Sequence, residues 1–256
     1  MNKSSFAMTL AVSTWTLAAI AVGAPHARQE RVITGASQTV GHSGGVKAWE
    51  KLDANGKVTA VGVDLPISVV ENPPDKPGTG PCGAVAVLAF PREAQQTTYF
   101  NHFEMQWNPH GHPPACCFGV PHFDLHFYGV PVADVSKIGP GDTAPPTAER
   151  LPAGFFYPGV KECVPQMGVH AVLPEQVGPG HVMTADMIAG FYHGKMHFVE
   201  PMITRAFLMK KQSFKMDVPM PKTLGRATSY PTKFEGIYDN KKQAYSLVFS
   251  EFKSMQ

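Results

Sequence analysis

The chain has 256 residues, of which 43% are hydrophobic and only 16% are charged, with 24 glycines and 24 prolines. This charged fraction lies well below the roughly 25% of an average soluble protein, which argues against disorder driven by charge repulsion. The formal net charge is +2, and no segment concentrates basic residues, so we do not expect a nucleic-acid-binding surface. Abundant glycine and proline argue against long helices and favour short strands joined by turns.

The first residues are typical of a secretory signal peptide. Lys3 precedes an apolar stretch over residues 6–22, and the small residues Gly23 and Ala24 follow it. Ser13, Thr14 and Thr16 interrupt this stretch, which is already short for a membrane-spanning helix. We therefore expect a signal peptide over residues 1–23, a periplasmic or secreted mature protein, and no membrane contact after cleavage.

Two hairpins frame the remaining chain. Alternating runs flank the turn residues 53–56, Asp-Ala-Asn-Gly, and a similar pair of runs surrounds Asp239 and Asn240. We expect a flexible start over residues 24–42 and a single β-rich domain over residues 43–256. The predicted fold is mainly β, an antiparallel distorted barrel or sandwich with one or two short helices.

The central third of the sequence alternates between polar and apolar residues. Residues 102–108 and 122–127 both follow this period of two, which indicates strands with one polar and one apolar face. A weaker alternation covers residues 193–198, and residues 183–193 are compatible with either a brief helix or a strand. Each of these strands would carry potential ligands on one face and core residues on the other.

Four cysteines, Cys82, Cys116, Cys117 and Cys163, are candidates for disulfides in an oxidising compartment. A bond between the neighbours Cys116 and Cys117 would be strained, so pairing of Cys82 and Cys163 with one member each is favoured. The expected disulfide near residue 116 would tie distant segments together. A thiolate metal site beside the histidines is the alternative.

The 11 histidines are the most informative residues. His110 and His112 lie two residues apart in a proline-rich turn, and His122, Asp124 and His126 share one face of the following predicted strand. A flat strand would separate His122 and His126 by roughly 13 Å at the backbone, so one ion could not easily bind both without strong twist or a bulge. Asp124 is more often a partner that orients an imidazole than a direct ligand.

Two further candidates lie downstream. His170 follows a glycine turn, and Glu200 offers a carboxylate at the end of a predicted strand. Imidazole and carboxylate together suit zinc, iron, manganese, nickel or copper(II), and three or four such ligands with an open position are typical of catalytic sites. The sequence contains no G-x-S-x-G elbow and no phosphate-binding glycine loop, which disfavours serine hydrolases and nucleotide-binding enzymes.

Four segments resemble those of an exported bacterial family described as a domain of unknown function. They are WNPHGHPP (107–114), VPHFDLHFYG (120–129), VPQMGVHA (164–171) and VEPMITRAFL (199–208), which carry the family's NPHGH, PHFDxHFY, MGxHA and EPMIT motifs. The similarity covers roughly residues 43–210. It implies a compact, mainly β protein with a distorted barrel or sandwich, and an ability of some members to form oligomers.

The motif positions of that family fall on the histidine candidates. Its histidines correspond to His112, His122, His126 and His170, and its glutamate corresponds to Glu200. The family often has an acidic residue just after the first histidine, where this chain has residues 113–117, Pro-Pro-Ala-Cys-Cys. A carboxylate ligand from that loop is therefore not expected.

These observations lead to one main hypothesis and two alternatives. We expect an exported metal-binding protein, serving periplasmic metal handling or the stress response, with one zinc or copper ion bound by His112, His122, His126 and His170. Glu200 would be a fifth ligand or would orient one, and His110 and Asp124 would support the ligands. The alternatives are a metal-dependent hydrolase or oxygenase, in which the ion activates water, and a metal-free oligomeric structural protein with buried polar histidines. A homo-oligomer is also compatible with the first hypothesis.

Overall fold

The computed structural model describes residue 1, residues 29–42 and residues 44–256. Apart from Met1, the signal peptide predicted over residues 1–23 lies outside the described residues. Within the described ranges, no helix combines the length and apolar character needed to cross a membrane.

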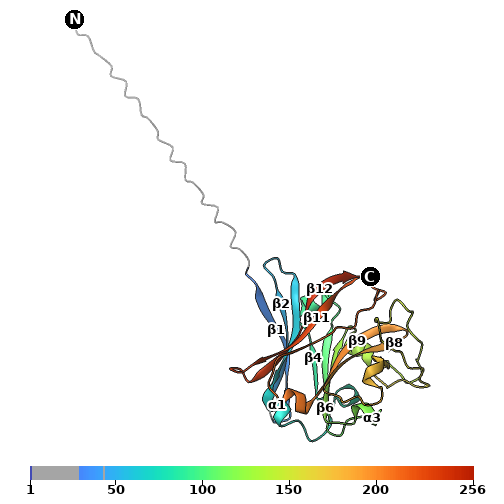
Figure 1. Ribbon diagram of the computed structural model, residues 1–256. Helices are drawn as coiled ribbons and strands as arrows, with labels where there is room; N and C mark the ends of the chain where they lie inside the picture. The colour runs from blue at the N-terminus through green and yellow to red at the C-terminus, as the bar shows by residue number, and fades with distance from the viewer. Residues whose placement is uncertain (2–28, 43) are drawn as a thin grey trace.

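Two antiparallel six-stranded sheets form a sandwich, as predicted, and neither sheet closes into a barrel (Figure 1). Sheet 1 has the strand order β1-β2-β3-β12-β11-β10, with bounds β1 (Arg31–Val40), β2 (Gly44–Leu52), β3 (Val58–Pro66), β10 (Phe214–Met216), β11 (Thr228–Asp239) and β12 (Ala244–Met255). Sheet 2 has the order β4-β5-β6-β9-β8-β7, with bounds β4 (Ala86–Ala89), β5 (His102–Asn108), β6 (His122–Tyr128), β7 (Val169–Ala171), β8 (Ala185–Tyr192) and β9 (Lys195–Thr204).

The helical segments are short but more numerous than the one or two that we predicted. Among the described residues, five α-helical segments contain four to six residues each, namely α1 (Ile67–Glu71), α2 (Arg92–Thr97), α3 (Ala115–Phe118), α4 (Val132–Val135) and α5 (Arg205–Leu208). Two 3₁₀ turns, η1 (Pro81–Gly83) and η2 (Pro174–Gln176), complete the set. Four of the α-helical segments begin directly after a proline. The fixed φ of proline suits the start of a helix, but proline inside a helix breaks it, so the many prolines of this chain keep its helices short.

Both predicted hairpins are confirmed. The turn over residues 53–57 joins β2 to β3, and residues 240–243 join β11 to β12. The undecided segment 183–193 contains the strand β8. The flexible start over residues 24–42 is wrong for residues 31–40, which form β1 and pair with β2. Most residues of β1 are exposed on both faces, so no alternation of apolar residues signals this strand.

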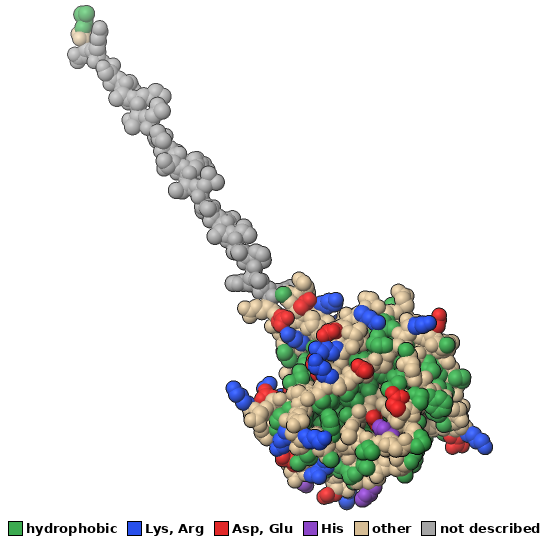
Figure 2. Space-filling model, viewed as in Figure 1, with side chains coloured by type: hydrophobic (Ala, Val, Ile, Leu, Met, Phe, Trp, Pro, Cys, Tyr) green, Lys and Arg blue, Asp and Glu red, His purple; other side chains and the backbone are tan. Residues whose placement is uncertain are grey.

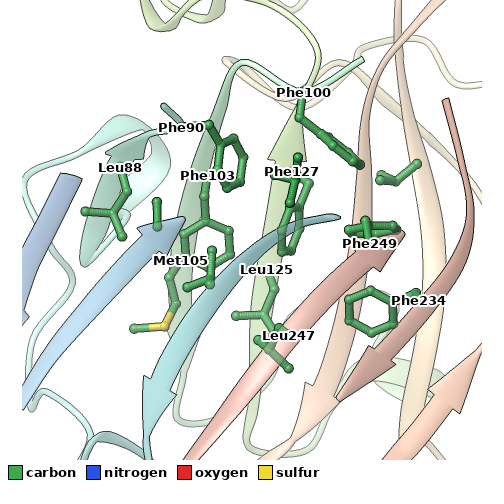
Figure 3. Packing of buried hydrophobic residues seen from close by; sticks show 14 of the residues in the cluster. Leu88, Phe90, Phe100, Phe103, Met105, Leu125, Phe127, Phe234, Leu247 and Phe249 are labelled. Atoms are coloured by element: carbon green, nitrogen blue, oxygen red, sulfur yellow. The ribbon is translucent and has the colours of Figure 1, made fainter. Parts of the chain in front are cut away.

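The core lies between the two sheets, where aromatic side chains interdigitate (Figure 3). Phe127 of β6 contacts Phe249 of β12 with ring centroids 4.8 Å apart and nearly perpendicular rings, a favourable geometry for aromatic pairs. Phe103 of β5 and Leu125 of β6 are completely buried in the same cluster. Because side chains alternate along a strand, the even-numbered residues of β5 and β6 face away from this core.

The opposite face of sheet 2 is polar and is also buried. His102 and Glu104 of β5 and His122, Asp124 and His126 of β6 have at most 3% of their surface exposed. The register places Glu104 opposite His126. Segments outside the strands, including α3 and the loop before β7, contribute to the lining of a cavity over this face. The fold therefore encloses a row of titratable side chains on the side of the sheet that is not the core.

Candidate metal centres

Two groups of three potential ligands lie on this polar face in the described part of the chain. The first triad consists of His112, His122 and Asp124, and the second triad consists of His126, His170 and Glu200. Within each triad, the candidate ligand atoms all lie within 4.8 Å of one another. The even-numbered face of β6 contributes to both triads, because His122 and Asp124 belong to the first and His126 to the second.

The first triad is assembled from β6 and the loop that precedes it. His122 Nε2 lies 3.0 Å from Asp124 Oδ1, and His112 Nε2 lies 3.4 Å from Asp124 Oδ2. Asn108 at the end of β5 donates a hydrogen bond from Nδ2 to Asp124 Oδ2 at 2.7 Å. This amide fixes the orientation of the carboxylate between the two imidazoles.

Backbone carbonyl groups set the tautomers of both histidines in the first triad. His112 Nδ1 lies 2.8 Å from Pro113 O, and His122 Nδ1 lies 2.6 Å from Val120 O. Since a carbonyl oxygen can only accept, Nδ1 must donate in each ring, and in a neutral imidazole Nε2 then has a free lone pair. Histidines that bind metals usually have this arrangement, in which one ring nitrogen donates to a carbonyl oxygen and the other is free to bind the ion.

The charges within the first triad are strongly coupled. Burial would raise the pKa of Asp124, but the imidazoles of His112 and His122 outweigh it and hold the pKa well below its usual range. Burial would likewise lower the pKa of His112, but the hydrogen bond and charge of Asp124 raise it to about 9. A metal ion that binds here at neutral pH therefore replaces a proton on His112.

A tight turn brings His112 to this position. Gly111 has φ +69°, and a Cβ atom at this residue would lie 2.1 Å from the carbonyl oxygen of Phe118. The neighbouring His112 N donates to the same Phe118 oxygen at 3.1 Å. Only glycine combines this left-handed conformation with such a close approach of the backbone.

The second triad joins three strands of sheet 2. His126 Nε2 of β6 lies 3.3 Å from Glu200 Oε2 of β9, and His170 Nε2 of β7 lies 3.7 Å from the same oxygen. His126 and Glu200 are buried, whereas the side chain of His170 is 24% exposed. Gly168 allows the chain to turn just before His170. Its φ is +79°, and a Cβ atom at this residue would lie 2.2 Å from the carbonyl oxygen of Phe191.

The electrostatics of the second triad differ between its two histidines. Burial would lower the pKa of His126, but the charge and proximity of Glu200 outweigh it and raise the pKa. For His170, burial is the largest influence and lowers the pKa, although Glu200 opposes it. The second triad therefore combines one histidine whose pKa is raised with one whose pKa is lowered.

Several atoms of the triads lack hydrogen-bond partners although they are buried. Within the described ranges these atoms are His122 Nε2, Asp124 Oδ1, His126 Nδ1, His126 Nε2 and Glu200 Oε2. Buried polar groups are almost always satisfied, so such a cluster calls for an occupant. In a tetrahedral zinc site with bonds of about 2.0–2.1 Å, neighbouring ligand atoms lie roughly 3.3 Å apart, and the spacings of 3.0 to 3.7 Å between imidazole and carboxylate atoms are close to this. The residues present therefore fit a transition-metal ion.

The geometry corrects the prediction of a single ion bound by four histidines. His122 and His126 belong to different triads, because β6 is extended and keeps them apart. Asp124 is a candidate ligand and not only a supporting residue, and Glu200 lies inside β9 and not at a strand end. His110 is exposed and belongs to neither triad.

Sequence reasoning missed three further histidine–carboxylate pairs in the described part of the chain, one of which is the exposed His193 with Asp142. His102 Nε2 lies 3.1 Å from Glu104 Oε1, and both side chains are almost completely buried on β5. The alternation over residues 102–108 already placed these two residues on one strand face. His181 Nε2 lies 2.8 Å from Asp186 Oδ2, and this pair has no comparable sequence signal because His181 lies in a loop.

The disulfide prediction is wrong, since all four cysteines are free. Cys82 and Cys163 direct their thiols to backbone carbonyl oxygens, of Pro165 at 2.8 Å and Gly139 at 3.0 Å respectively. Cys116 Sγ lies 2.6 Å from Cys117 Sγ, beyond the roughly 2.05 Å of a disulfide bond. None of the four cysteines belongs to a candidate metal group in the described part of the chain.

Comparison with known proteins adds one partial match. Residues 53–107 are similar to a family described as TTHB210-like, hypothetical protein TTHB210. This segment runs from the first hairpin through β5 and contains no member of either triad, and the histidine and glutamate motifs considered above lie beyond it. No curated protein and no solved structure matches the chain. The class supported by the fold and the site is therefore a β-sandwich with two candidate metal centres.

Proposed function

We propose that this protein binds two transition-metal ions, one in each triad, with zinc or copper(II) as the natural occupants. The observation that carries the proposal is the cluster of buried imidazole and carboxylate atoms without hydrogen-bond partners, four of which belong to His122, Asp124 and His126 on β6. Two imidazoles and one carboxylate form a donor set that suits these ions. Periplasmic metal handling or a stress response, after export by the residue 1–23 signal peptide, is the role that we assign to this binding.

Metal analysis of untagged protein tests the proposal. We expect about two equivalents of metal after titration with zinc, and about one equivalent in either His112→Ala or His170→Ala. These two histidines are the most exposed member of their triads, so their removal should leave the fold intact. His110→Ala is the matched control, because His110 lies on the same loop as His112 but is exposed and outside both triads.

Less than about a tenth of an equivalent of every transition metal, with no uptake on titration, would contradict the proposal. That result would favour the metal-free alternative, in which the histidines form a buried polar network of a structural, oligomeric protein. An unchanged metal content in both alanine variants would show that metal binds elsewhere.

A metal-dependent hydrolase or oxygenase is the second candidate function. It is favoured by a cavity that contacts both triads, because three protein ligands leave a coordination position open to water or substrate. Exchange kinetics separate the two roles. A delivery protein should release its metal to a competing chelator quickly, whereas an enzyme should retain it and lose turnover with its removal.

A further inference from the structure

A cavity of about 690 Å³ lies over the polar face of sheet 2. This volume is within the roughly 300–1,000 Å³ that is usual for small-molecule sites. His112 and Asp124 of the first triad and His170 and Glu200 of the second triad all line it. The cavity therefore contacts both candidate metal centres and is large enough for an organic ligand beside them.

Most of the cavity wall is apolar. Its apolar lining consists mainly of proline, valine and phenylalanine side chains, among them Pro114, Phe118, Phe156, Val160, Val172 and Ile188. They come from strands β7 and β8, from the loops around them, and from the segment between β5 and β6 that contains α3. In the space-filling view, a histidine and an acidic side chain are visible within a mainly hydrophobic part of the surface (Figure 2).

Apart from the two histidines, the charged residues of the cavity are all acidic in the described part of the chain. Asp124, Glu162 and Glu200 line it, and no lysine or arginine does. Without metal, these three carboxylates outnumber the imidazolium of His112, so the cavity disfavours an anion. With a divalent ion in each triad, two neutral imidazoles and one carboxylate leave 2 − 1 = +1 per triad, so the polar floor becomes attractive to an anion.

We propose that the cavity binds an organic monocarboxylate with an apolar chain or ring. The carboxylate coordinates a triad-bound ion at its open position, and the apolar body lies against the valine, proline and phenylalanine side chains. This inference rests on the proposed metal binding, since no lysine or arginine lines the cavity in the described part of the chain. The proposed substrate or cargo is therefore a small, mainly apolar acid.

Calorimetric titration with octanoate and with 1-octanol tests this inference. These probes share a chain length, but only octanoate is an anion. Both are titrated into the full chain loaded with zinc and freed of excess metal, and into the chelator-treated chain. We expect octanoate to bind at least about tenfold more tightly to the zinc-loaded protein, and 1-octanol to change by less than about twofold.

A variant of the wall supplies the second measurement. Phe156 lines the cavity and is 49% exposed, so Phe156→Ala should fold normally and keep its zinc while its affinity for octanoate falls severalfold. Val182→Ala is the control, because Val182 is 79% exposed and is not among the lining residues.

The outcomes separate this inference from the proposed function. Two equivalents of zinc with equal octanoate affinity in both forms would overturn the inference and leave metal binding intact. Equal preference for octanol and octanoate in the loaded protein would also overturn it. Absence of zinc uptake would overturn both, and the metal content measured before each titration identifies that case.

Discussion

Replacement of the buried pair His126 and Glu200 by apolar residues should have opposite effects on the metal-free and the metal-loaded protein. These side chains lie 3.3 Å apart and are 0% and 2% exposed. In the double variant His126→Phe/Glu200→Leu, the new phenyl ring keeps the packing against Tyr128 and Phe198, whose ring centroids lie 5.6 and 4.7 Å from that of His126. The variant removes the second triad without removing its volume.

The expected magnitudes follow from the burial of this pair. Replacing a buried ion pair by apolar residues of similar volume is often neutral or stabilising by about 1–4 kcal/mol, whereas removing one partner costs about 3–5 kcal/mol. In the metal-free protein, the double variant should therefore be at least as stable as the parent, and more stable than Glu200→Leu alone. At a free zinc concentration of about 100 times Kd, each intact site adds about 2.7 kcal/mol. Zinc should then stabilise the parent by about 5.4 kcal/mol and the double variant by about half of that.

Urea unfolding followed by tryptophan fluorescence, with chelator and with zinc, measures both effects. The matched control is His102→Phe/Glu104→Leu, which removes a similarly buried histidine–carboxylate pair 3.1 Å apart on the neighbouring strand β5. This control should respond to zinc like the parent. An equal zinc-dependent stabilisation of the parent and the double variant would refute the assignment of the second triad.

Three further predictions concern other parts of the molecule. Gly111→Ala places a Cβ atom 2.1 Å from Phe118 O and should weaken zinc binding at the first triad alone, which a two-step zinc titration would show as the loss of one step. Burial raises the pKa of Glu50 above its ordinary 4.5, so the folded state holds this proton more tightly, and stability should fall as pH rises above about 4.5 through the folded-state pKa. Glu50→Gln should make the free energy of unfolding depend less steeply on pH in this range. An unchanged pH dependence would show that other groups cause it. Under denaturing, non-reducing conditions, a thiol reagent should titrate all four cysteines, and a smaller count would reveal a disulfide.

The strands that carry the site could be predicted because their two faces differ. Along β5 and β6, apolar residues such as Phe103 and Leu125 alternate with Glu104 and Asp124, and a period of two has no other simple explanation. The same alternation supplied the ligand candidates on β6. The strand β1 could not be predicted, because most of its residues are exposed on both faces and its apolar residues therefore do not alternate with polar ones.

The grouping of the ligands could not be predicted, because it depends on contacts between distant segments. The sequence separation of His112, His170 and Glu200 does not reveal which of them reaches which end of β6. The register between β6 and β9, which places Glu200 beside His126, decides this. The backbone carbonyls that fix the tautomers of His112 and His122 are likewise a property of the loop before β6 and not of residue type.

The alternation along β6 makes the core and both triads depend on the same register. Its odd-numbered residues, including Phe127, fill the space between the sheets, and its even-numbered residues face the cavity. Insertion of a single residue after His122 would exchange these faces for the rest of the strand. Asp124 and His126 would then enter the aromatic core, and the phenyl rings would enter the cavity. A chain of this fold can thus vary its loops one residue at a time, but in this strand it can change length only by two.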